Sequence, residues 1–492
     1  MVTATDLGTG STTSWARAYG WPAALAVIGV VSAGVYAYSG DLHWFTQWIA
    51  AYVMTFIGHF ALYLIACYLV LRMPAGLARG VRLAVLAIII IFAGCFRAQL
   101  VDKRPYLSTD TYRYIWDGRV QAAGINPYRY VPSAPELAHL REDKIYPNIN
   151  RGDYAPTPYP PVAQAIYLGV YLAHPLSINA FRIAMSLFDM ITLLSVMLVL
   201  ARAGLDPARA IIFAWHPLVI WEGAHSGHVE SAFIAFLALA FLARVYKKPA
   251  LTGVMIGLAA MVKFYPGLLL PALMFSTDDG GLKPADAARK QGWFKRLITT
   301  VFSKPNIKLL AAFVLTVIAS YLPYLSVGKG VFGYLPHEFE EEGYVDDGTR
   351  YFLFSLIRKV LPLPTTVFIA AAALALLGAG LWWIIRTKRD AIDIARGAVA
   401  LIGLYLLLTT PRYPWYYAWI IPFLCFVPRA GWLYLTGATI LLYLLWYIPN
   451  VYPHLPVWLG ASVYAPAVAL LAWDHFSARR GRLDKASAVL IE

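Results

Sequence analysis

Charged residues are scarce in this sequence. Of its 492 residues only 14% are Asp, Glu, Lys or Arg, whereas 60% are hydrophobic, and the mean hydropathy is +0.59. Soluble domains carry about 25% charged residues, so the composition excludes a soluble globular protein. Apolar runs of membrane-spanning length recur along the chain. The composition therefore predicts an all-α polytopic membrane protein.

Cysteine is also scarce, and nucleotide-binding motifs are absent from the sequence. The three cysteines, Cys67, Cys95 and Cys425, lie within apolar segments and have neither the spacing of a disulfide framework nor that of a metal site. Neither GxxxxGK[ST] nor a GxGxxG in a βαβ context occurs. The chain shows no internal repeat of the kind found in many transporters. These absences argue against an ATP-driven pump and, less strongly, against a secondary transporter.

The net charge of +14 follows the predicted membrane topology and does not indicate nucleic-acid binding. By the positive-inside rule, both termini and the basic connecting segments lie in the cytoplasm. The loops 102–177 and 326–364 then lie outside. The first apolar run, Trp21 to Tyr38, is long for a signal peptide and is predicted to remain as a helix. The basic segments fall near residues 72–82, 202–209, 244–248, 277–306, 386–390 and 478–482.

Most apolar segments are long enough to cross a bilayer, but three are short. Residues 161–173 would form roughly 20 Å of helix, less than the ~30 Å hydrocarbon core, and are predicted to lie in the membrane interface. Segments 250–262 and 264–276 meet at Lys263 and are predicted to form a helical hairpin or re-entrant pair. The predicted helices are about 21–38, 48–71, 82–101, 178–201, 209–223, 228–245, 250–262, 264–276, 307–325, 366–385, 396–410, 415–428, 431–449 and 457–473.

The loop 102–177 is polar and contains a predicted amphipathic helix. Ser108 or Thr109 can cap this helix, which continues to about Ala123. The polar residues Asp110, Tyr114, Asp117 and Gln121 follow one face, and Ile115, Trp116 and Val120 follow the other. The pattern predicts an interfacial helix.

Asp110 is the candidate general base of this helix. It lies in the first turn, where backbone N–H groups favour the carboxylate, and an ionised carboxylate at a membrane surface can accept a proton. The alternative is that Asp110 only begins the helix and that Asp117 pairs with Arg113 at i, i+4.

Five motifs together resemble a known family. DTYRYIWDGRVQAAGINPY, YPP, WHPLVIWEGAHSGH, VKFYP and PRYPWYYAWIIPF occur in that order. They resemble the polyprenyl-phosphate-sugar-dependent glycosyltransferases of the GT-C superfamily, most closely the bacterial family 87 mannosyltransferases and more distantly the catalytic subunit of eukaryotic GPI mannosyltransferase I. The resemblance runs from about residue 83 to 450. It implies a GT-C bundle of about 12 to 14 transmembrane helices, with interfacial helices in the first outer loop.

The resemblance also implies a domain organisation. Residues 1–72 would form two additional N-terminal helices, residues 73–450 the catalytic membrane domain with the outer loop 102–177, and residues 451–492 the last helix and a basic cytoplasmic tail. The site would face the periplasm of a bacterial inner membrane.

The activity implied is an inverting transfer of a sugar, mannose by analogy, from a polyprenyl phosphate to a hydroxyl of a lipid-linked or cell-envelope glycan. Asp110 matches the base. Many relatives have Asp-x-Asp here and some use a divalent metal, whereas this chain has Ser108-Thr109-Asp110. We therefore expect no metal and no other cofactor, with a divalent ion as the less favoured alternative. The expected partners are the donor, the acceptor and membrane lipid, and no nucleic acid.

A lipid-linked donor needs cations to neutralise its leaving phosphate. Lys263, at the predicted hairpin tip, is the strongest candidate, although it could snorkel to the interface. Arg412 could equally anchor an aromatic belt. His225 and His228, with Glu222 nearby, could contact phosphate, join a structural network or, on a weak signal, hold a metal. The candidates are Lys263, Arg412, His228, His225 and Arg119.

Other residues are candidates for orienting substrates: Asp117, Tyr114, Arg113, Glu222, Tyr159, Trp415 and Tyr416. The aromatic ones offer flat faces to a sugar but are also typical of interface belts. Asp189, in the middle of an apolar helix, should pack against a partner. The alternative functions are a flippase or transporter of lipid-linked sugars and, less favoured, a non-enzymatic assembly subunit.

Overall fold

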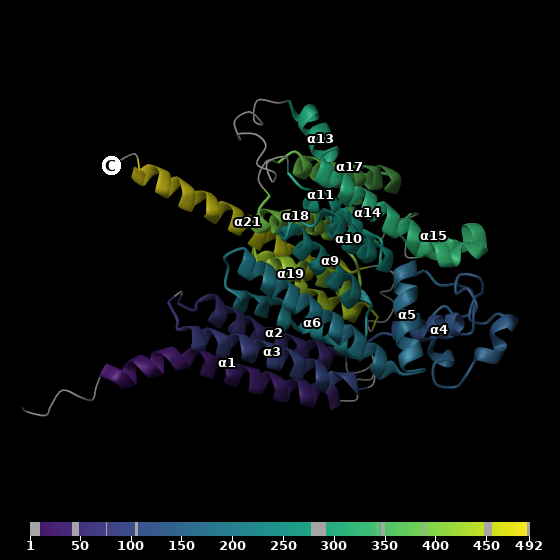
Figure 1. Ribbon diagram of the computed structural model, residues 1–492, viewed down its shortest axis with the longest axis horizontal. Helices are drawn as coiled ribbons and strands as arrows, with labels where there is room; N and C mark the ends of the chain where they lie inside the picture. Colours follow the sequence, from purple (N-terminus) through teal and green to yellow (C-terminus); the bar gives the residue numbers. More distant parts are fainter. Residues whose placement is uncertain are drawn as a thin grey trace, which may run out of the picture.

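The computed structural model describes residues 10–41, 49–74, 76–103, 107–276, 292–341, 343–345, 350–386, 389–446 and 455–489. Over these residues helices are the only regular elements, and no strand occurs (Figure 1). The prediction of an all-α fold is confirmed. Residues 277–291 of the predicted basic loop 277–306 lie outside the described residues.

Eight helices are long and apolar enough to cross a membrane in the part of the chain that is described. The prediction of an integral, polytopic membrane protein is therefore confirmed. The elements that contain these spans are α1 (Gly10–Asp41), α2 (Ile49–Leu71), α3 (Arg79–Val101), α6 (Ile178–Arg202), α14 (Lys304–Tyr321) with its 3-10 extension (Leu322–Phe332), α17 (Thr365–Ile384), α18 (Ala391–Thr409) and α21 (Val457–Val489).

Several predicted spans are interrupted helices, so long helices are fewer than the 12 to 14 predicted spans. Segment 207–225 consists of a 3-10 turn (Pro207–Ala210), α7 (Ile211–Ala214), α8 (Pro217–Ile220) and a π-helical turn (Trp221–His225). Segment 414–424 divides into a 3-10 helix (Pro414–Ile420) and α19 (Ile421–Leu424), and segment 430–446 into α20 (Ala430–Ala438) and a 3-10 helix (Thr439–Trp446). Proline removes a backbone donor and interrupts the first two segments at Pro207, Pro217 and Pro422, whereas segment 430–446 contains no proline. Because residues 211–225 are all buried, their irregular backbone is shielded from lipid.

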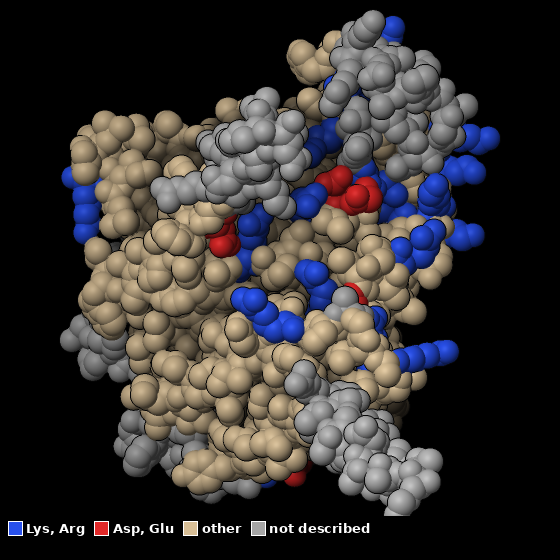
Figure 2. Space-filling model, turned by 90° about the vertical axis from the view of Figure 1, so that its left-hand side faces the viewer, with Lys and Arg blue, Asp and Glu red and all other residues tan. Residues whose placement is uncertain are grey.

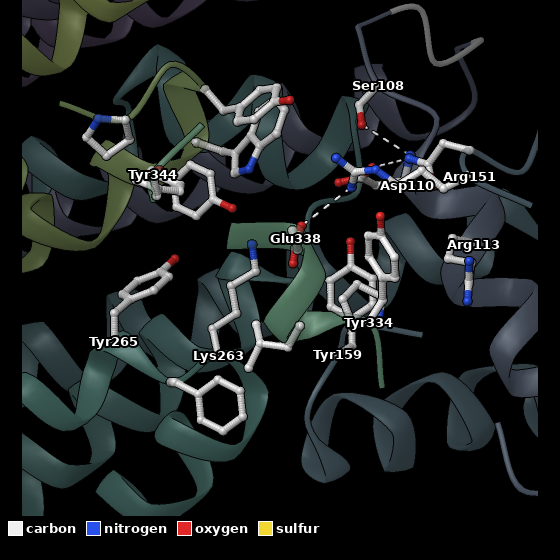
Figure 3. Close-up of a pocket in the computed structure, with 18 of the residues that line it drawn as sticks. Ser108, Asp110, Arg113, Arg151, Tyr159, Lys263, Tyr265, Tyr334, Glu338 and Tyr344 are labelled. Atoms are coloured by element: carbon white, nitrogen blue, oxygen red, sulfur yellow. Dashed lines mark hydrogen bonds and ion pairs between the residues drawn. The ribbon is translucent and has the colours of Figure 1, made fainter. Parts of the chain in front are cut away.

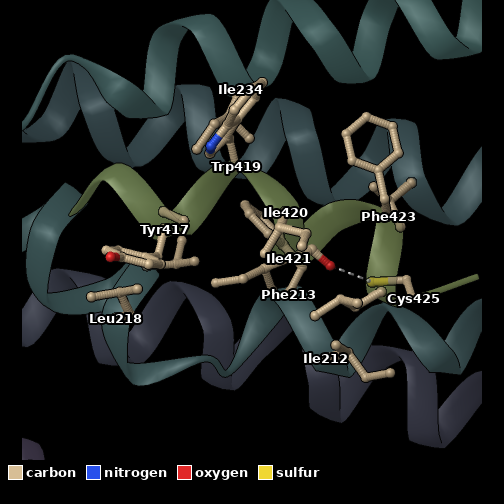
Figure 4. Close-up of a cluster of buried hydrophobic side chains, with 14 of the residues drawn as sticks. Ile212, Phe213, Leu218, Ile234, Tyr417, Trp419, Ile420, Ile421, Phe423 and Cys425 are labelled. Atoms are coloured by element: carbon tan, nitrogen blue, oxygen red, sulfur yellow. Dashed lines mark hydrogen bonds between the residues drawn. The ribbon is translucent and has the colours of Figure 1, made fainter. Parts of the chain in front are cut away.

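The interrupted segment 414–424 packs at the centre of the bundle (Figure 4). Tyr417 and Trp419 are fully buried there and lie with Leu218 of α8 and Ile234 of α9 (Glu230–Val245). The Tyr417 hydroxyl lies 2.6 Å from that of Tyr464 and donates to the Pro411 carbonyl at 2.8 Å. These contacts fix the segment that also carries Trp415 and Tyr416.

Lys263 lies where a helical hairpin turns. The first arm is α10 (Pro249–Val262), which follows directly on α9, and the second is a 3-10 helix (Tyr265–Leu269) followed by α11 (Leu270–Leu273). Arg244, near the end of α9, donates to the Met274 carbonyl at 3.4 Å, so the second arm returns to the end of α9 where α10 begins. The predicted hairpin is confirmed.

Two helices of the loop 102–177, α4 (Asp110–Ala122) and α5 (Pro161–Ala173), lie together at one end of the bundle (Figure 1). The rings of Tyr114 and Tyr167 stack with centroids 4.7 Å apart. A Cβ on Gly118 would lie 2.5 Å from the Tyr167 carbonyl oxygen, so only glycine permits this approach. The shorter elements elsewhere are 3-10 helices at Pro135–Leu140 and Tyr146–Asn148, and α13 (Trp293–Val301), α15 (Leu335–Glu341) and α16 (Phe352–Arg358).

The apolar face of α4 contacts protein. Ile115, Trp116 and Val120 are buried against the loop residues Leu137, Leu140 and Ile145. The interfacial prediction assumed that this face meets lipid. The loop that follows α4 is long enough to fold back over it and to bury the same apolar surface.

Lys and Arg side chains gather on the end of the molecule opposite α4 and α5 (Figures 1 and 2). Figure 2 looks onto this end, where the start of α1 and the end of α21 also lie.

Candidate active site

A cavity of about 810 Å³ borders α4, and Figure 3 shows part of its lining. Its size suits a ligand of some tens of atoms. Segments far apart in the sequence meet around it: the start of α4, residues 150–160, the hairpin tip, residues 334–351 and residues 405–416. The predicted site residues that line it are Asp110, Arg113, Tyr159, Lys263, Trp415 and Tyr416.

Asp110 is the first residue of α4, and its side chain is 20% exposed. Its Oδ1 accepts a hydrogen bond from Asn150 Nδ2 at 2.8 Å, and the Tyr114 hydroxyl donates to Oδ2 at 3.5 Å. The Ser108 Oγ accepts from the Asp110 backbone N–H at 3.1 Å, whereas Thr109, the N-cap residue, makes no side-chain capping hydrogen bond. Burial raises the pKa of Asp110, against the opposing effects of Lys263 and Asn150. A raised pKa makes this carboxylate a better proton acceptor than an ordinary aspartate.

The start of α4 is joined to the turn that precedes α9. Thr111 Oγ1 donates to the Ser226 carbonyl at 2.6 Å. Gly227 has a φ of +71°, and a Cβ there would lie 2.9 Å from Thr111 Oγ1. Glycine satisfies both the backbone conformation and the close approach. The two motifs DTYRYIWDG and WEGAHSGH therefore form one site.

This junction places His228 beside Asp110. His228 Nδ1 lies 3.7 Å from Asp110 Oδ2, and its Nε2 lies 3.4 Å from Glu222 Oε2. The ring is 1% exposed and stacks on Trp415 with centroids 3.9 Å apart. His228 lies behind the cavity-lining residues and between two carboxylates, which does not favour the predicted contact with a phosphate.

Lys263 lines the cavity and is paired with the Glu230 carboxylate. Its Nζ lies 4.6 Å from the centroid of the Tyr416 ring. Figure 3 shows the side chain extending into the same space that Asp110 borders. The partner that a lysine in such surroundings needs is thus present.

Arg113 and Asp117 form a buried ion pair, with Nε and Oδ1 3.0 Å apart. Arg113 also donates twice to the Ala155 carbonyl at 3.1 Å, and Gln164 donates to Asp117 Oδ2 at 3.1 Å. In Figure 3 the Arg113 guanidinium is turned away from the cavity. The structure thus shows the pairing of Arg113 with Asp117 at i, i+4 that the sequence analysis gave as the alternative to a role in the chemistry.

Other predicted residues lie away from the cavity lining. Arg412 and His225 are buried, and Arg119 is on the later part of α4. Tyr114 is buried and its hydroxyl donates to Asp110. Glu222 is buried beside His228 and accepts a hydrogen bond from the Tyr443 hydroxyl at Oε1, at 2.8 Å. Asp189 pairs with Arg97 Nε at 3.0 Å, which confirms the expected partner.

Two arginines that were not predicted line the cavity. Arg350 is 2% exposed, and its guanidinium lies 5.1 Å from the Tyr413 ring centroid and 5.4 Å from that of Tyr344. Arg151 Nη1 lies 3.5 Å from Glu338 Oε1, and its Nε lies 3.0 Å from Glu341 Oε1. Both lie in polar loops whose sequence alone does not separate a lining residue from a solvated one.

The motif Ser108-Thr109-Asp110 offers a single carboxylate as a possible metal ligand. Within the described ranges no group of three His, Cys, Asp or Glu residues is arranged to hold one. Asp110 is the single carboxylate of its triplet, and its Oδ1 accepts from an amide nitrogen. Hard divalent cations prefer several oxygen ligands.

Comparison with known proteins identifies the family. The model for the N-terminal domain of the α-(1→6)-mannopyranosyltransferases matches residues 17–277, and the model for glycosyltransferase family 87 matches residues 158–411. No curated protein and no solved structure matches the chain at a significant level. Since each of the two matches covers more than half of the sequence, the chain belongs to the family 87 mannosyltransferase group of membrane glycosyltransferases.

Proposed function

We propose that the enzyme transfers mannose from a polyprenyl-phosphate donor to a hydroxyl group of a lipid-linked or cell-envelope glycan, by an inverting single displacement. The observation that carries the proposal is that Asp110 and Lys263 line one cavity from opposite elements of the fold. A proton acceptor and a cation are the two groups that this reaction needs.

Asp110 acts as the general base. The acceptor oxygen attacks C1 of the sugar as the bond from C1 to the phosphate oxygen breaks, and Asp110 takes the hydroxyl proton. The contacts from Asn150 and Tyr114 orient the carboxylate for this transfer. A single displacement inverts the anomeric configuration.

Cations on the cavity wall neutralise the departing phosphate. Lys263 is the predicted one, and Arg350 and Arg151 extend the set. Hydrogen bonds from such charged groups to phosphate oxygens are stronger than hydrogen bonds between neutral groups. We therefore assign binding of the donor phosphate to these cavity-lining residues and not to Arg412, His225 or Arg119.

Aromatic residues form the remaining walls. Trp415 and Tyr416 follow one another on the 3-10 helix, and Tyr159 faces them from the loop before α5. Flat rings pack against the apolar C–H faces of a pyranose. This arrangement supports a sugar-binding role for Tyr159 and Tyr416 over a role in an interface belt, while Trp415 is stacked on His228 and Tyr413 and supports the wall.

The reaction proceeds without a metal ion or other cofactor in this proposal. Asp110 has hydrogen-bond donors around it and no second carboxylate in its triplet, which supports proton transfer as its task. Activity in EDTA, unchanged by added Mg²⁺ or Mn²⁺, is the expected result. A loss in EDTA that either ion restores would contradict it.

The cavity faces the periplasm of a bacterial inner membrane, and both termini are cytoplasmic. The basic residues at the opposite end of the molecule support this orientation through the positive-inside rule (Figure 2). A lipid-linked donor fits an active site on the side of the membrane that nucleotide sugars do not reach.

A reconstituted transfer assay tests the function. The purified protein in proteoliposomes should form a mannosylated glycolipid from polyprenyl-phosphate [¹⁴C]mannose and none from GDP-[¹⁴C]mannose. Digestion with α- and β-specific mannosidases then reports whether the configuration of the donor is inverted. Movement of the labelled lipid between leaflets without any glycosidic product would instead favour the flippase alternative.

A further inference from the structure

A buried row of polar side chains continues from Asp110 away from the cavity. Asp110 Oδ2 and His228 Nδ1 are 3.7 Å apart, and His228 Nε2 and Glu222 Oε2 are 3.4 Å apart. His228 and Glu222 are 1% and 2% exposed. The imidazole therefore bridges the proposed base and a second, deeper carboxylate.

The His228 ring is held in one orientation. Trp415 stacks on it at an interplanar angle of 21°, and the Thr111–Ser226 hydrogen bond fixes the turn that precedes it. Neither ring nitrogen makes a hydrogen bond of good geometry with any residue that the structure describes. Each nitrogen instead faces one carboxylate, at distances that substrate binding can shorten, as catalytic contacts often tighten in the bound complex.

The charged groups around His228 come from four elements. Asp110 begins α4, Glu222 lies on the π-helical turn, Glu230 begins α9 and Lys263 is at the hairpin tip. Tyr443 reaches the same group through its hydrogen bond to Glu222. Glu230 is paired with Lys263, and Asp110 and Glu222 are the carboxylates that face the two ring nitrogens. A proton taken up at Nδ1 can therefore be matched by release of the Nε2 proton to Glu222.

We propose that His228, held by Glu222, takes over from Asp110 the proton that the acceptor hydroxyl loses. This inference rests on the function proposed above. The acceptor O–H bond breaks as the new C1–O bond forms, the C1–O bond to phosphate breaks with its electron pair on the phosphate, and the proton passes to Asp110 Oδ2. In the same step His228 Nδ1 takes this proton from Asp110 Oδ2 and the Nε2 proton passes to the Glu222 carboxylate, so two protons move together and the imidazole stays neutral.

The transfer returns Asp110 to its carboxylate form before the products leave. The two transfers run in reverse once the cavity is open again, and the proton leaves to water through Asp110. Because His228 acts on the base and not on the substrate, it is a positioning residue. Glu222 is also a positioning residue, because it acts on His228.

The test compares His228→Gln and Glu222→Gln with the wild type in single-turnover transfer from a polyprenyl-phosphate mannose. Both should lower the rate by roughly 100-fold, the lower end of what general acid–base catalysis contributes, and leave the donor and acceptor KM nearly unchanged. The double variant should be no slower than either single variant, because the two residues act as a unit.

A proton inventory in H₂O–D₂O mixtures separates this role from a structural one. The wild-type rate should depend on deuterium content with the curvature of two protons in transfer, and both variants should give a straight line. His216→Gln is the matched control, because His216 is equally buried, contacts Thr436 Oγ1 at 3.0 Å and is not among the residues that line the cavity. It should retain the wild-type curvature even if it lowers stability.

Wild-type turnover in His228→Gln, or a curved inventory in that variant, would overturn the inference. Should His228→Gln fail to fold, Glu222→Gln decides: it keeps the size of the side chain, and a straight line supports the proposal while a curved one overturns it. Failure of the proposed function has a different signature, namely no product from the wild type, or full activity of Asp110→Asn.

Discussion

Arg113 and Asp117, one turn apart on α4, form an ion pair at 3.0 Å that is almost completely buried. Asp110 begins the same helix and borders the cavity instead. The two aspartates of the motif DTYRYIWDG thus have different surroundings. Asp110 is available to a substrate, and Asp117 holds the loop together.

This difference predicts a stability defect for Asp117→Asn. The substitution leaves the Arg113 charge buried without its counter-ion, and breaking a buried pair in this way costs about 3 to 5 kcal/mol. We expect a lower melting temperature and, for the folded fraction, turnover within about tenfold of wild type. Thermal unfolding in detergent and transfer rates normalised to folded protein measure the two effects. A stable but inactive variant would assign Asp117 to the chemistry.

Because Lys263 is paired with Glu230, its effect on protein stability can be measured separately from its effect on donor binding. Lys263→Met alone leaves Glu230 buried without its counter-ion, so both stability and donor affinity should fall. The double variant Lys263→Met, Glu230→Gln removes both charges and should recover stability. Its donor affinity should remain weaker by about 1.5 to 3 kcal/mol, the value of a hydrogen bond to a charged group.

Binding of a fluorescent polyprenyl-phosphate analogue and thermal unfolding measure these two properties. Arg412→Ala is a useful comparison, since Arg412 is buried but does not line the cavity. It should reduce stability more than donor affinity. Wild-type donor affinity in the double variant would show that Lys263 has only a packing role.

The orientation in the membrane predicts which positions are accessible from outside. A cysteine at Gly343, in the loop beside the cavity, should react with a membrane-impermeant thiol reagent in intact cells. A cysteine at Ala287, in the predicted cytoplasmic loop outside the described residues, should react only after the cells are permeabilised. Of the native cysteines, Cys67 and Cys425 are buried and Cys95 lies within α3. The reverse labelling pattern would place the cavity in the cytoplasm.

The pH dependence of kcat/KM follows from the surroundings of Asp110. Burial raises the pKa of this carboxyl, so its protonated form persists to a higher pH than that of an ordinary aspartate, whose pKa is about 3.9. A general base works only when deprotonated, and activity should therefore fall as the pH drops through this raised value. Asn150→Ala removes the 2.8 Å hydrogen bond to the carboxylate and should move the acid limb to a still higher pH.

Rates of transfer over a series of buffers at constant ionic strength give the profile. An acid limb at or below the ordinary aspartate pKa, or a limb that Asn150→Ala leaves in place, would argue against Asp110 as the titrating group.

Local patterns in the sequence were sufficient to predict some parts of the molecule. The bounds of α4 follow from a capping residue and a helical period, and the structure places its ends within a residue or two of the prediction. The position of Lys263 at a hairpin turn could be predicted because the two apolar segments beside it are too short to cross a bilayer. Each of these features depends on residues close together in the chain.

Other parts depend on contacts that no local pattern encodes. Arg151 pairs with Glu338 and Glu341, nearly two hundred residues away. Hydropathy reports the apolar character of residues 207–225 but not the prolines' effect on their backbone, so a continuous helix was predicted there. Likewise, the apolar face of α4 would look the same in sequence whether lipid or the loop at residues 137–145 covered it.

The central claim is that Asp110 is the general base, and Asp110→Asn tests it most directly. Asparagine keeps the size of the side chain but cannot accept the hydroxyl proton, and general base catalysis contributes about 10²- to 10⁴-fold. We expect single-turnover transfer from polyprenyl-phosphate mannose to fall by at least about 100-fold, while the donor still binds and the protein remains folded. Transfer at the wild-type rate by a folded Asp110→Asn protein would contradict the account.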